Sequence, residues 1–178
     1  MAQRTFKTDT SQLASVIPEM RAGDRVLLSG TIYTARDAAH KRIFELLDSG
    51  LEPPFELRGA VIYYAGPTPA REGMAVGSCG PTTSGRMDAF TPRLLDLGLL
   101  GMIGKGERSP EVISAIVRNR AIYLCAVGGA GALIARHIKT SEVVAFPELG
   151  CESIKRMSIE DLPLTVGIDA QGTSIFDH

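Results

Sequence analysis

The sequence predicts a single α/β domain with a mixed sheet. Strand-like apolar runs alternate with segments of helical spacing in the middle of the chain, whereas strand-like runs dominate both ends. No linker, internal repeat or low-complexity tract divides the 178 residues, a length sufficient for one hydrophobic core. We therefore expect one compact domain over residues 1–178, with helices packed on parallel and antiparallel strands.

The first part of the chain is expected to hold an edge strand and a loose turn within residues 1–22, followed by a short strand over 25–30. A helix should come next, because Thr34 and Asp37 have the spacing of a capping box and the apolar residues after them form one helical stripe. The β-prone run 60–65 then predicts a buried strand.

The second part continues the alternation. Thr91-Pro92 and Ser109-Pro110 each predict a helix start, with a capping hydroxyl before a proline at the first helical position. The glycines of 128–131 predict a tight turn from a strand into another helix. The strands expected here are 99–103, 121–127, 142–146 and 164–168.

Composition excludes several classes of function. A net charge of −1 without a basic run gives no strong attraction to nucleic acid or to a membrane surface. No apolar stretch approaches the roughly 20 residues of a membrane helix, and the N-terminus lacks a signal region, so a cytoplasmic location is expected. The three cysteines, Cys79, Cys125 and Cys151, are too widely spaced for a disulfide framework or a local zinc site, so we expect no metal on this chain.

The segment 77–88 carries the clearest functional signal. Glycines frame three consecutive hydroxyls, Thr82, Thr83 and Ser84, which are followed by Arg86. Exposed backbone N–H groups, hydroxyls and a guanidinium together suit a carboxylate or a phosphate. The alternative is a helix start in which one hydroxyl is the cap and the arginine is solvated. Since a cap needs only one hydroxyl, the segment favours a ligand site.

Two further loops carry cations. Lys105 lies between two glycines at the end of an apolar run, in a sequence that does not match the P-loop motif. It is either a solvated turn residue or a group that is free to reach a ligand. Arg36 and His40, four residues apart with Asp37 beside them, form either an anion clamp at a helix start or a solvated face. If the fold brings Arg36, Arg86 and Lys105 together, they would suit a substrate with two carboxylates.

Five motifs occur in order along the chain: 29–40, 80–88, 101–106, 128–131 and 146–150. Together they resemble the β subunit, or C-terminal domain, of the iron–sulfur-dependent class I fumarases and L-tartrate dehydratases. The resemblance covers residues 5–176 and implies a swivelling β/β/α domain.

The resemblance also implies a partner α subunit, in a heterotetramer, whose cysteines hold a [4Fe–4S] cluster with one iron open to the substrate. The active site would lie between the two chains, and this chain would bind no cofactor itself. The expected reaction is the reversible hydration of a small dicarboxylate, fumarate, to malate. Tartrate dehydration and mesaconate hydration remain alternatives, as does a carboxylate-binding module without activity of its own.

The resemblance assigns substrate-binding residues one by one. The positions that hold the substrate carboxylates match Arg36, Arg86 and Lys105 of this chain, and Thr83 lies in the same motif as Arg86. These residues come from three separate loops, so the assignment requires the fold to bring the loops together.

Three further residues match catalytic positions. Thr82 matches a threonine proposed to transfer a proton next to a carboxylate, although a free hydroxyl is a weak base near neutral pH and needs assistance. Asp37 and His40 match positions that would orient the neighbouring arginine. The chain departs from the family pattern at Cys79 and Cys151, neither of which is a proposed carboxylate ligand.

Overall fold

The computed structural model describes residues 2–127 and 129–177, so Gly128 of the expected glycine turn lies outside the described residues. The expected α/β fold with a mixed sheet is confirmed. The elements in chain order are β1 (Thr5–Asp9), α1 (Leu13–Val16), η1 (Ile17–Glu19), β2 (Arg25–Thr34), α2 (Asp37–Asp48), β3 (Val61–Tyr63), η2 (Ser84–Met87), α3 (Thr91–Asp96), β4 (Gly101–Gly104), α4 (Pro110–Asn119), β5 (Ile122–Cys125), α5 (Gly131–Ala135), β6 (Ile138–Ala145), η3 (Pro147–Glu152) and β7 (Ile154–Ile168).

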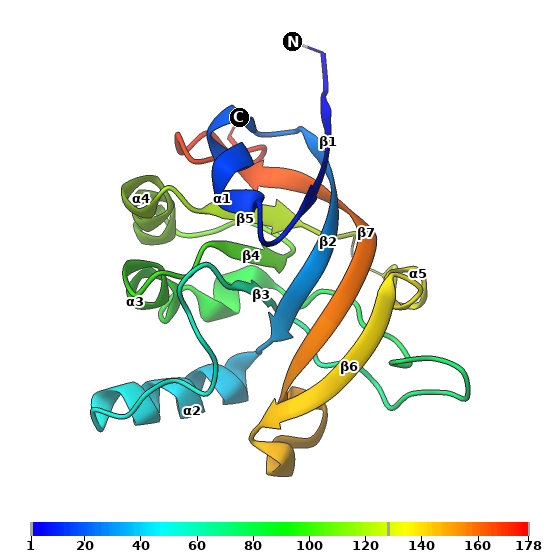
Figure 1. Cartoon of the computed structure of the whole chain (residues 1–178). Helices are drawn as coiled ribbons and strands as arrows, with labels where there is room; N and C mark the ends of the chain where they lie inside the picture. The colour runs from blue at the N-terminus through cyan, green and yellow to red at the C-terminus, as the bar shows by residue number, and fades with distance from the viewer. Residues whose placement is uncertain (1, 128, 178) are drawn as a thin grey trace.

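The sheet closes on itself. Its strand order is β1-β2-β3-β4-β5-β7-β6, and β7 also pairs with β2, so β2, β3, β4, β5 and β7 form a barrel-like ring. Strands β1 to β5 are parallel to one another, whereas β7 runs antiparallel to β2, β5 and β6. Figure 1 shows the long strands β2, β7 and β6 curving along one side, with helices α2, α3 and α4 on the other.

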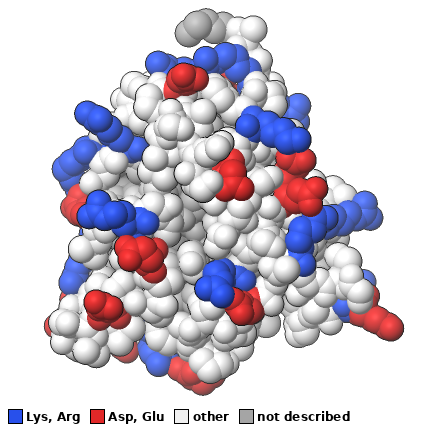
Figure 2. All heavy atoms as spheres, in the orientation of Figure 1, with Lys and Arg blue, Asp and Glu red and all other residues white. Residues whose placement is uncertain are grey.

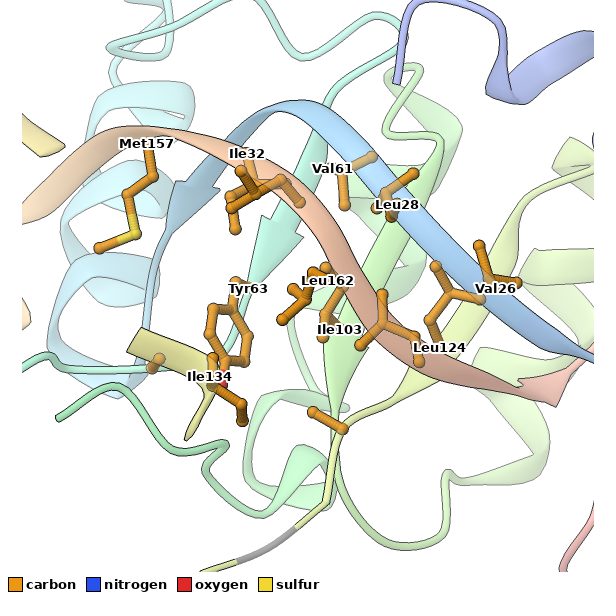
Figure 3. Packing of buried hydrophobic residues seen from close by; sticks show 14 of the residues in the cluster. Val26, Leu28, Ile32, Val61, Tyr63, Ile103, Leu124, Ile134, Met157 and Leu162 are labelled. Carbon is orange, nitrogen blue, oxygen red and sulfur yellow. The ribbon is translucent and has the colours of Figure 1, made fainter. Parts of the chain in front are cut away.

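Side chains of the central strands alternate between two cores, as the period of a strand requires. Val61 and Tyr63 of β3 join a core shared with β2 and β7, which Figure 3 shows from close by. Ile62 of β3 joins a second core, as does Tyr64, the residue after the end of β3. This core also contains buried residues of α2, α3 and α4. The central strands are therefore apolar on both faces, which explains why they form continuous apolar runs in the sequence.

The predicted helix starts are confirmed only in part. Ser109 caps α4, because its hydroxyl accepts a hydrogen bond from the N–H of Val112. The expected capping box before α2 is wrong: Thr34 still belongs to β2, and its hydroxyl accepts a hydrogen bond from the N–H of Lys155. Thr91 is not the cap of α3 either, since it is already the first helical residue and its hydroxyl donates to the carbonyl of Met87.

Two segments differ more from expectation. The predicted loose turn before residue 22 contains α1 and η1, which bury Leu13 and Ile17 in the first core. The strand expected over 164–168 is the end of the 15-residue β7. Within β7, Asp161 has a positive φ of 49°. The strand nevertheless continues, because it pairs with β2 on one side and with β6 and then β5 on the other.

One face of the molecule shows how its surface charges are arranged. Figure 2 shows basic and acidic side chains interspersed on one face, without a large region of a single sign. Among the helices of the described residues, none has the length and apolar character needed to cross a membrane.

Candidate functional site

The parallel strands bring the predicted site residues to one edge of the sheet. Tyr33 and Thr34 of β2 pair with Ile62 and Tyr63 of β3, and β3 pairs in turn with β4. The carboxyl ends of these strands therefore meet at the same edge, which is where ligands bind both in open parallel sheets and in closed parallel barrels. We call this edge, with the loops that follow β2, β3 and β4, the carboxyl edge.

The hydroxyl segment is built into this edge by backbone hydrogen bonds. The N–H of Thr82 donates to the carbonyl of Tyr64, at 2.7 Å, and the N–H of Ser84 donates to the carbonyl of Lys105, at 2.9 Å. Thr83 forms a parallel bridge with Lys105. The segment thus continues the sheet beyond the ends of β3 and β4, and the hydroxyl residues lie directly beside Lys105.

Gly104 makes room for this close approach. A Cβ atom at this position would lie 2.0 Å from Oγ of Ser84 and 2.8 Å from the ring of Tyr64. The last residue of β4 must therefore lack a side chain for the hydroxyl segment to pair with Lys105.

The three hydroxyls have different surroundings. Thr82 is half-buried, Thr83 is exposed and Ser84 is fully buried. Thr83 occupies the position before η2 but forms no side-chain cap there. The Oγ of Ser84 lies 2.7 Å from the hydroxyl of Tyr123. Thr82 and Thr83 are the two hydroxyls left with access to a ligand.

Arg86 and Asp37 join two loops of the edge. Nη2 of Arg86 lies 2.9 Å from Oδ2 of Asp37, and its Nε donates to Oδ1 at 3.2 Å. Arg86 follows β3 along the chain and Asp37 is the first residue of α2. The carboxylate therefore orients the guanidinium from across the site, while half of the arginine side chain (53%) remains exposed.

Arg36 has a carboxylate neighbour of its own. Its Nε lies 3.9 Å from Oε1 of Glu152, which also accepts a hydrogen bond from the N–H of Ala38 at 3.5 Å. Gly66 packs against the arginine, because a Cβ there would lie 3.1 Å from its Cδ. Arg36 thus lies between the end of β2, the segment after β3 and η3.

His40 lies beneath this arginine. It is fully buried, and its Nδ1 donates to the carbonyl of Arg36 at 2.7 Å. Its ring packs at a tilt against Tyr64 and Phe90, with centroids 5.7 and 5.5 Å away. Burial lowers the pKa of His40 to about 4, so the ring is neutral near pH 7. A neutral, enclosed ring supports the backbone of Arg36 and has no open path to a substrate.

The predicted cations therefore occupy adjoining loops of one edge: Arg36 follows β2, Arg86 follows β3 and Lys105 follows β4. Thr82, Thr83 and Asp37 lie in the same loops, and His40 lies below them. Two open cavities, of about 410 and 1190 Å³, are lined by other residues: the first by the segment 52–57, the second by Arg4 and Asp24. Neither cavity is lined by the predicted cations, which lie with Thr82 and Thr83 at the carboxyl edge.

The cysteines are dispersed through the molecule. Burial raises the pKa of Cys79 to about 12 and also raises that of the half-buried Cys125, whereas Cys151 is exposed. Over residues 2–127 and 129–177, no three His, Cys, Asp or Glu side chains are grouped as a metal would require. The donors described here do not fit an iron–sulfur cluster held by this chain.

Four supporting residues of the site had no clear signal in the sequence. Glu152 approaches Arg36 from η3, and Tyr123 reaches Ser84 from β5. Arg108 forms a buried ion pair with Asp88, 2.7 Å apart, directly below the hydroxyl segment. An arginine and an aspartate in a loop ordinarily indicate solvated residues, so only the fold reveals these contacts.

Comparison with known proteins places the chain in a family. The family model described as the C-terminus of fumarase matches residues 2–178. The chain is 38% identical over 169 residues to the anaerobic class I fumarate hydratase of Escherichia coli (strain K12), covering 94% of this chain and 31% of that protein. It is 37% identical over 173 residues to fumarate hydratase 2 of Leishmania major, covering 96% and 30%.

A third relative is shorter. The chain is 36% identical over 168 residues to the putative L(+)-tartrate dehydratase subunit beta of Methanocaldococcus jannaschii. The aligned region covers 91% of this chain and 86% of that subunit. The chain therefore spans about a third of the length of the fumarate hydratases but most of this subunit. These relatives are named as fumarate hydratases and as a tartrate dehydratase subunit, and enzymes of both names are hydro-lyases. With its full-length match to the family model, the chain belongs to the family of the fumarase C-terminus.

Proposed function

We propose that this chain supplies the dicarboxylate-binding half of a hydro-lyase that interconverts fumarate and malate. The observation that carries the proposal is that three cation-bearing loops meet at the carboxyl edge. Thr82 lies beside them, where its N–H is bonded to the carbonyl of Tyr64. A C4 dicarboxylate has an anionic group at each end of a short rigid chain, so separate cations can hold it in one orientation. Hydrogen bonds between charged partners contribute roughly 1.5–3 kcal/mol each.

Each residue would have a distinct role. Arg86 and Lys105, from adjoining loops, would bind one carboxylate, with the N–H and hydroxyl of Thr83 beside them. Arg36, the residue before Asp37, would bind the other carboxylate. Held at both ends, the substrate would present its double bond to the space above the hydroxyl segment, which is the positional advantage that accelerates reactions.

Thr82 is the proposed proton-transfer group of this chain. Hydration adds a hydroxyl to one carbon of the double bond and a proton to the other, and malate loses them in the reverse direction. The hydroxyl of Thr82 would exchange that proton at the carbon next to a bound carboxylate. Because a threonine hydroxyl is a weak base, the nearby cations must stabilise the charge that develops as the proton leaves.

Asp37 and His40 would act through the arginines. Asp37 fixes the guanidinium of Arg86 by two contacts. His40 holds the carbonyl of Arg36 from inside the core. We assign neither residue a contact with the substrate.

The proposal includes a partner. Thr83 and half of the Arg86 side chain are exposed at the carboxyl edge, and the family resemblance puts a [4Fe–4S] cluster on another chain, so we propose that an α subunit completes the site and carries that cluster. The tartrate dehydratase relative is named as a subunit and matches this chain over most of its length, which supports a separate β chain in a hetero-oligomer.

The same relative supports a second candidate. Tartrate carries two hydroxyls between its carboxylates, so the same three cations would bind its ends while the partner selects the central groups. Mesaconate, with a methyl group, is a third substrate of this shape. A carboxylate-binding module without activity would share the cations but lack turnover with any partner.

The test is to assemble the chain anaerobically with a candidate cluster-binding α subunit and to assay fumarate, L-tartrate and mesaconate in parallel. We expect activity from the complex, and an at least tenfold loss of kcat/KM in Arg86→Gln, because a charge-assisted contact is removed (about 1.4 kcal/mol per tenfold). Arg118→Gln, which breaks an exposed ion pair with Asp96, is the control. Activity of this chain alone, or equal kinetics in both variants, would contradict the proposal.

A further inference from the structure

Arg108 lies in an unusual position for an arginine. Its side chain is completely buried, and its guanidinium carbon lies 5.2 Å from the ring centre of Tyr64 and 4.9 Å from that of Tyr123. Its Nε donates to Asp88 at 2.7 Å, and its Nη2 donates to Thr91 at 2.9 Å and to the hydroxyl of Tyr64 at 3.1 Å. The buried charge is thus paired and hydrogen-bonded on several sides.

This ion pair connects the two cation-bearing loops. Asp88 lies two residues after Arg86, and Arg108 lies three residues after Lys105. The second carboxylate oxygen of Asp88 accepts a hydrogen bond from the N–H of Ser109, at 2.7 Å. Asp88 therefore binds both the side chain of Arg108 and the backbone beyond it, which fixes the loop after η2 against the loop after β4.

Tyr123 makes a second connection between the same loops. Its hydroxyl lies 2.7 Å from Oγ of Ser84 and 2.8 Å from the carbonyl of Gly106. Both bonds are satisfied when Ser84 donates to Tyr123 and Tyr123 donates to Gly106. Burial raises the pKa of this phenol, which keeps its proton in place. The hydroxyl segment and the Lys105 turn therefore rest on one buried polar cluster, made up of Arg108, Asp88, Tyr123 and Ser84.

We propose that Arg108 is a positioning residue, which sets the placement of Arg86 relative to Lys105 for a ligand with carboxylate groups. This inference rests on the proposed function for the identity of the ligand, whereas the link between the two loops is a property of this chain alone. Arg108 does not reach the ligand itself, because its side chain is enclosed. Arg108 holds Arg86 and Lys105 in register before binding, so the ligand does not have to order them.

A purely structural role makes a different prediction, and a double variant separates the two. Arg108→Met with Asp88→Asn removes both charges, and the amide oxygen still offers an acceptor to the N–H of Ser109, so the double variant should restore much of the stability that either single variant loses. If Arg108 only stabilises the core, the double variant regains ligand affinity together with stability. If Arg108 positions the loops, stability returns but affinity does not.

Two readouts on the full chain test the proposal. The first is titration with L-malate, followed by NMR, in which we expect the double variant to bind at least about tenfold more weakly than wild type. The second, without ligand, is hydrogen exchange of the Ser84 amide, which is bonded to Lys105. We expect it to accelerate at least about tenfold more than the amides of β4 and β5. Ile116→Val, a buried change in α4, is the control for general destabilisation.

If the double variant fails to fold, Tyr123→Phe keeps the ring and removes only the hydroxyl that joins Ser84 to Gly106. It should also accelerate exchange at Ser84. Wild-type exchange at Ser84 and wild-type affinity in the folded variants would overturn the proposal. Faster exchange at Ser84, in a chain whose wild-type form binds no L-malate, would support the loop link and contradict the proposed function.

Discussion

Arg86 and Asp37 are 49 positions apart in the chain, yet Nη2 of the arginine lies 2.9 Å from the carboxylate of the aspartate. This ion pair joins the loop after β3 to the start of α2, and so determines where one proposed carboxylate-binding cation lies relative to another, Arg36. The pair is partly exposed, so its main consequence concerns orientation rather than stability.

The first prediction follows from that exposure. Asp37→Asn should change the free energy of unfolding by less than about 1 kcal/mol, as for other exposed ion pairs. It should nevertheless weaken L-malate binding several-fold, because the amide cannot hold the guanidinium by two charged contacts. The measurements are urea denaturation and NMR titration. Asp48→Asn, which breaks the exposed pair with Arg93, is the matched control. Equal affinities in the two variants would refute the orienting role of Asp37.

The second prediction concerns the buried pair. Asp88→Asn should reduce the free energy of unfolding by about 3–5 kcal/mol, because it leaves the enclosed charge of Arg108 without its carboxylate. Interaction with Tyr64 and Asp88 outweighs desolvation and raises the pKa of Arg108, so the charge persists. Urea denaturation against Asp96→Asn, which breaks a pair with both side chains about half exposed, gives the comparison. Similar losses in the two variants would contradict this account.

The third prediction is a pH dependence caused by His40. Its pKa is about 4 in the folded chain, below the ordinary 6.5, so the unfolded chain takes up the proton first. The neutral ring therefore contributes fully to the free energy of unfolding above pH 6.5. This contribution decreases as the pH falls and is lost near pH 4, a total change of about 3 kcal/mol (about 1.4 kcal/mol per pH unit).

His40→Asn keeps a donor toward the carbonyl of Arg36 but cannot titrate. Its unfolding free energy should lose the slope between pH 6.5 and 4 that the wild type shows, whatever its absolute stability. Chemical denaturation at several pH values provides the measurement. An unchanged slope in the variant would mean that other groups cause the acid sensitivity.

The fourth prediction uses the close approach at Gly104. Gly104→Ala would place a methyl group within 2.0 Å of Ser84, and should displace the hydroxyl segment, lower the Tm and weaken L-malate binding at least about tenfold. Gly85→Ala is the control in the same segment, since its Cβ would lie 3.8 Å from the carbonyl of Glu107. The comparison needs a thermal melt and a titration of each variant. A Gly104→Ala chain that binds as well as the control would show that the approach has no importance for the site.

Local signals predicted much of the fold. The central strands are apolar on both faces, and the helix at Ser109 begins with a cap, a proline and an acid, so these elements are visible in short windows of sequence. The sequence predicts only the end of the long strand β7, within which the structure places Asp161 at a positive φ. Pairing with β2 and β6, which lie far away in sequence, maintains the strand.

The exposed part of the candidate site was also predictable, because cations and hydroxyls in glycine-rich loops have a chemistry that turns do not require. The supporting residues were not. Asp88, Arg108 and Glu152 have partners in other loops, and a charged residue in a loop does not indicate whether it will be buried. His40 was predicted near the site, but only the fold shows that its ring is enclosed between Tyr64 and Phe90.

The most direct test of the central claim is an NMR titration of the ¹⁵N-labelled chain with L-malate, with butyrate as the monocarboxylate control. The account predicts that L-malate shifts the amides of 36–37, 82–86 and 105–106 together, with one affinity that falls in Arg86→Gln and not in Arg118→Gln. Butyrate should bind much more weakly, because it has one carboxylate. Shifts elsewhere in the molecule, or equal responses to the two ligands, would contradict a dicarboxylate site at the carboxyl edge.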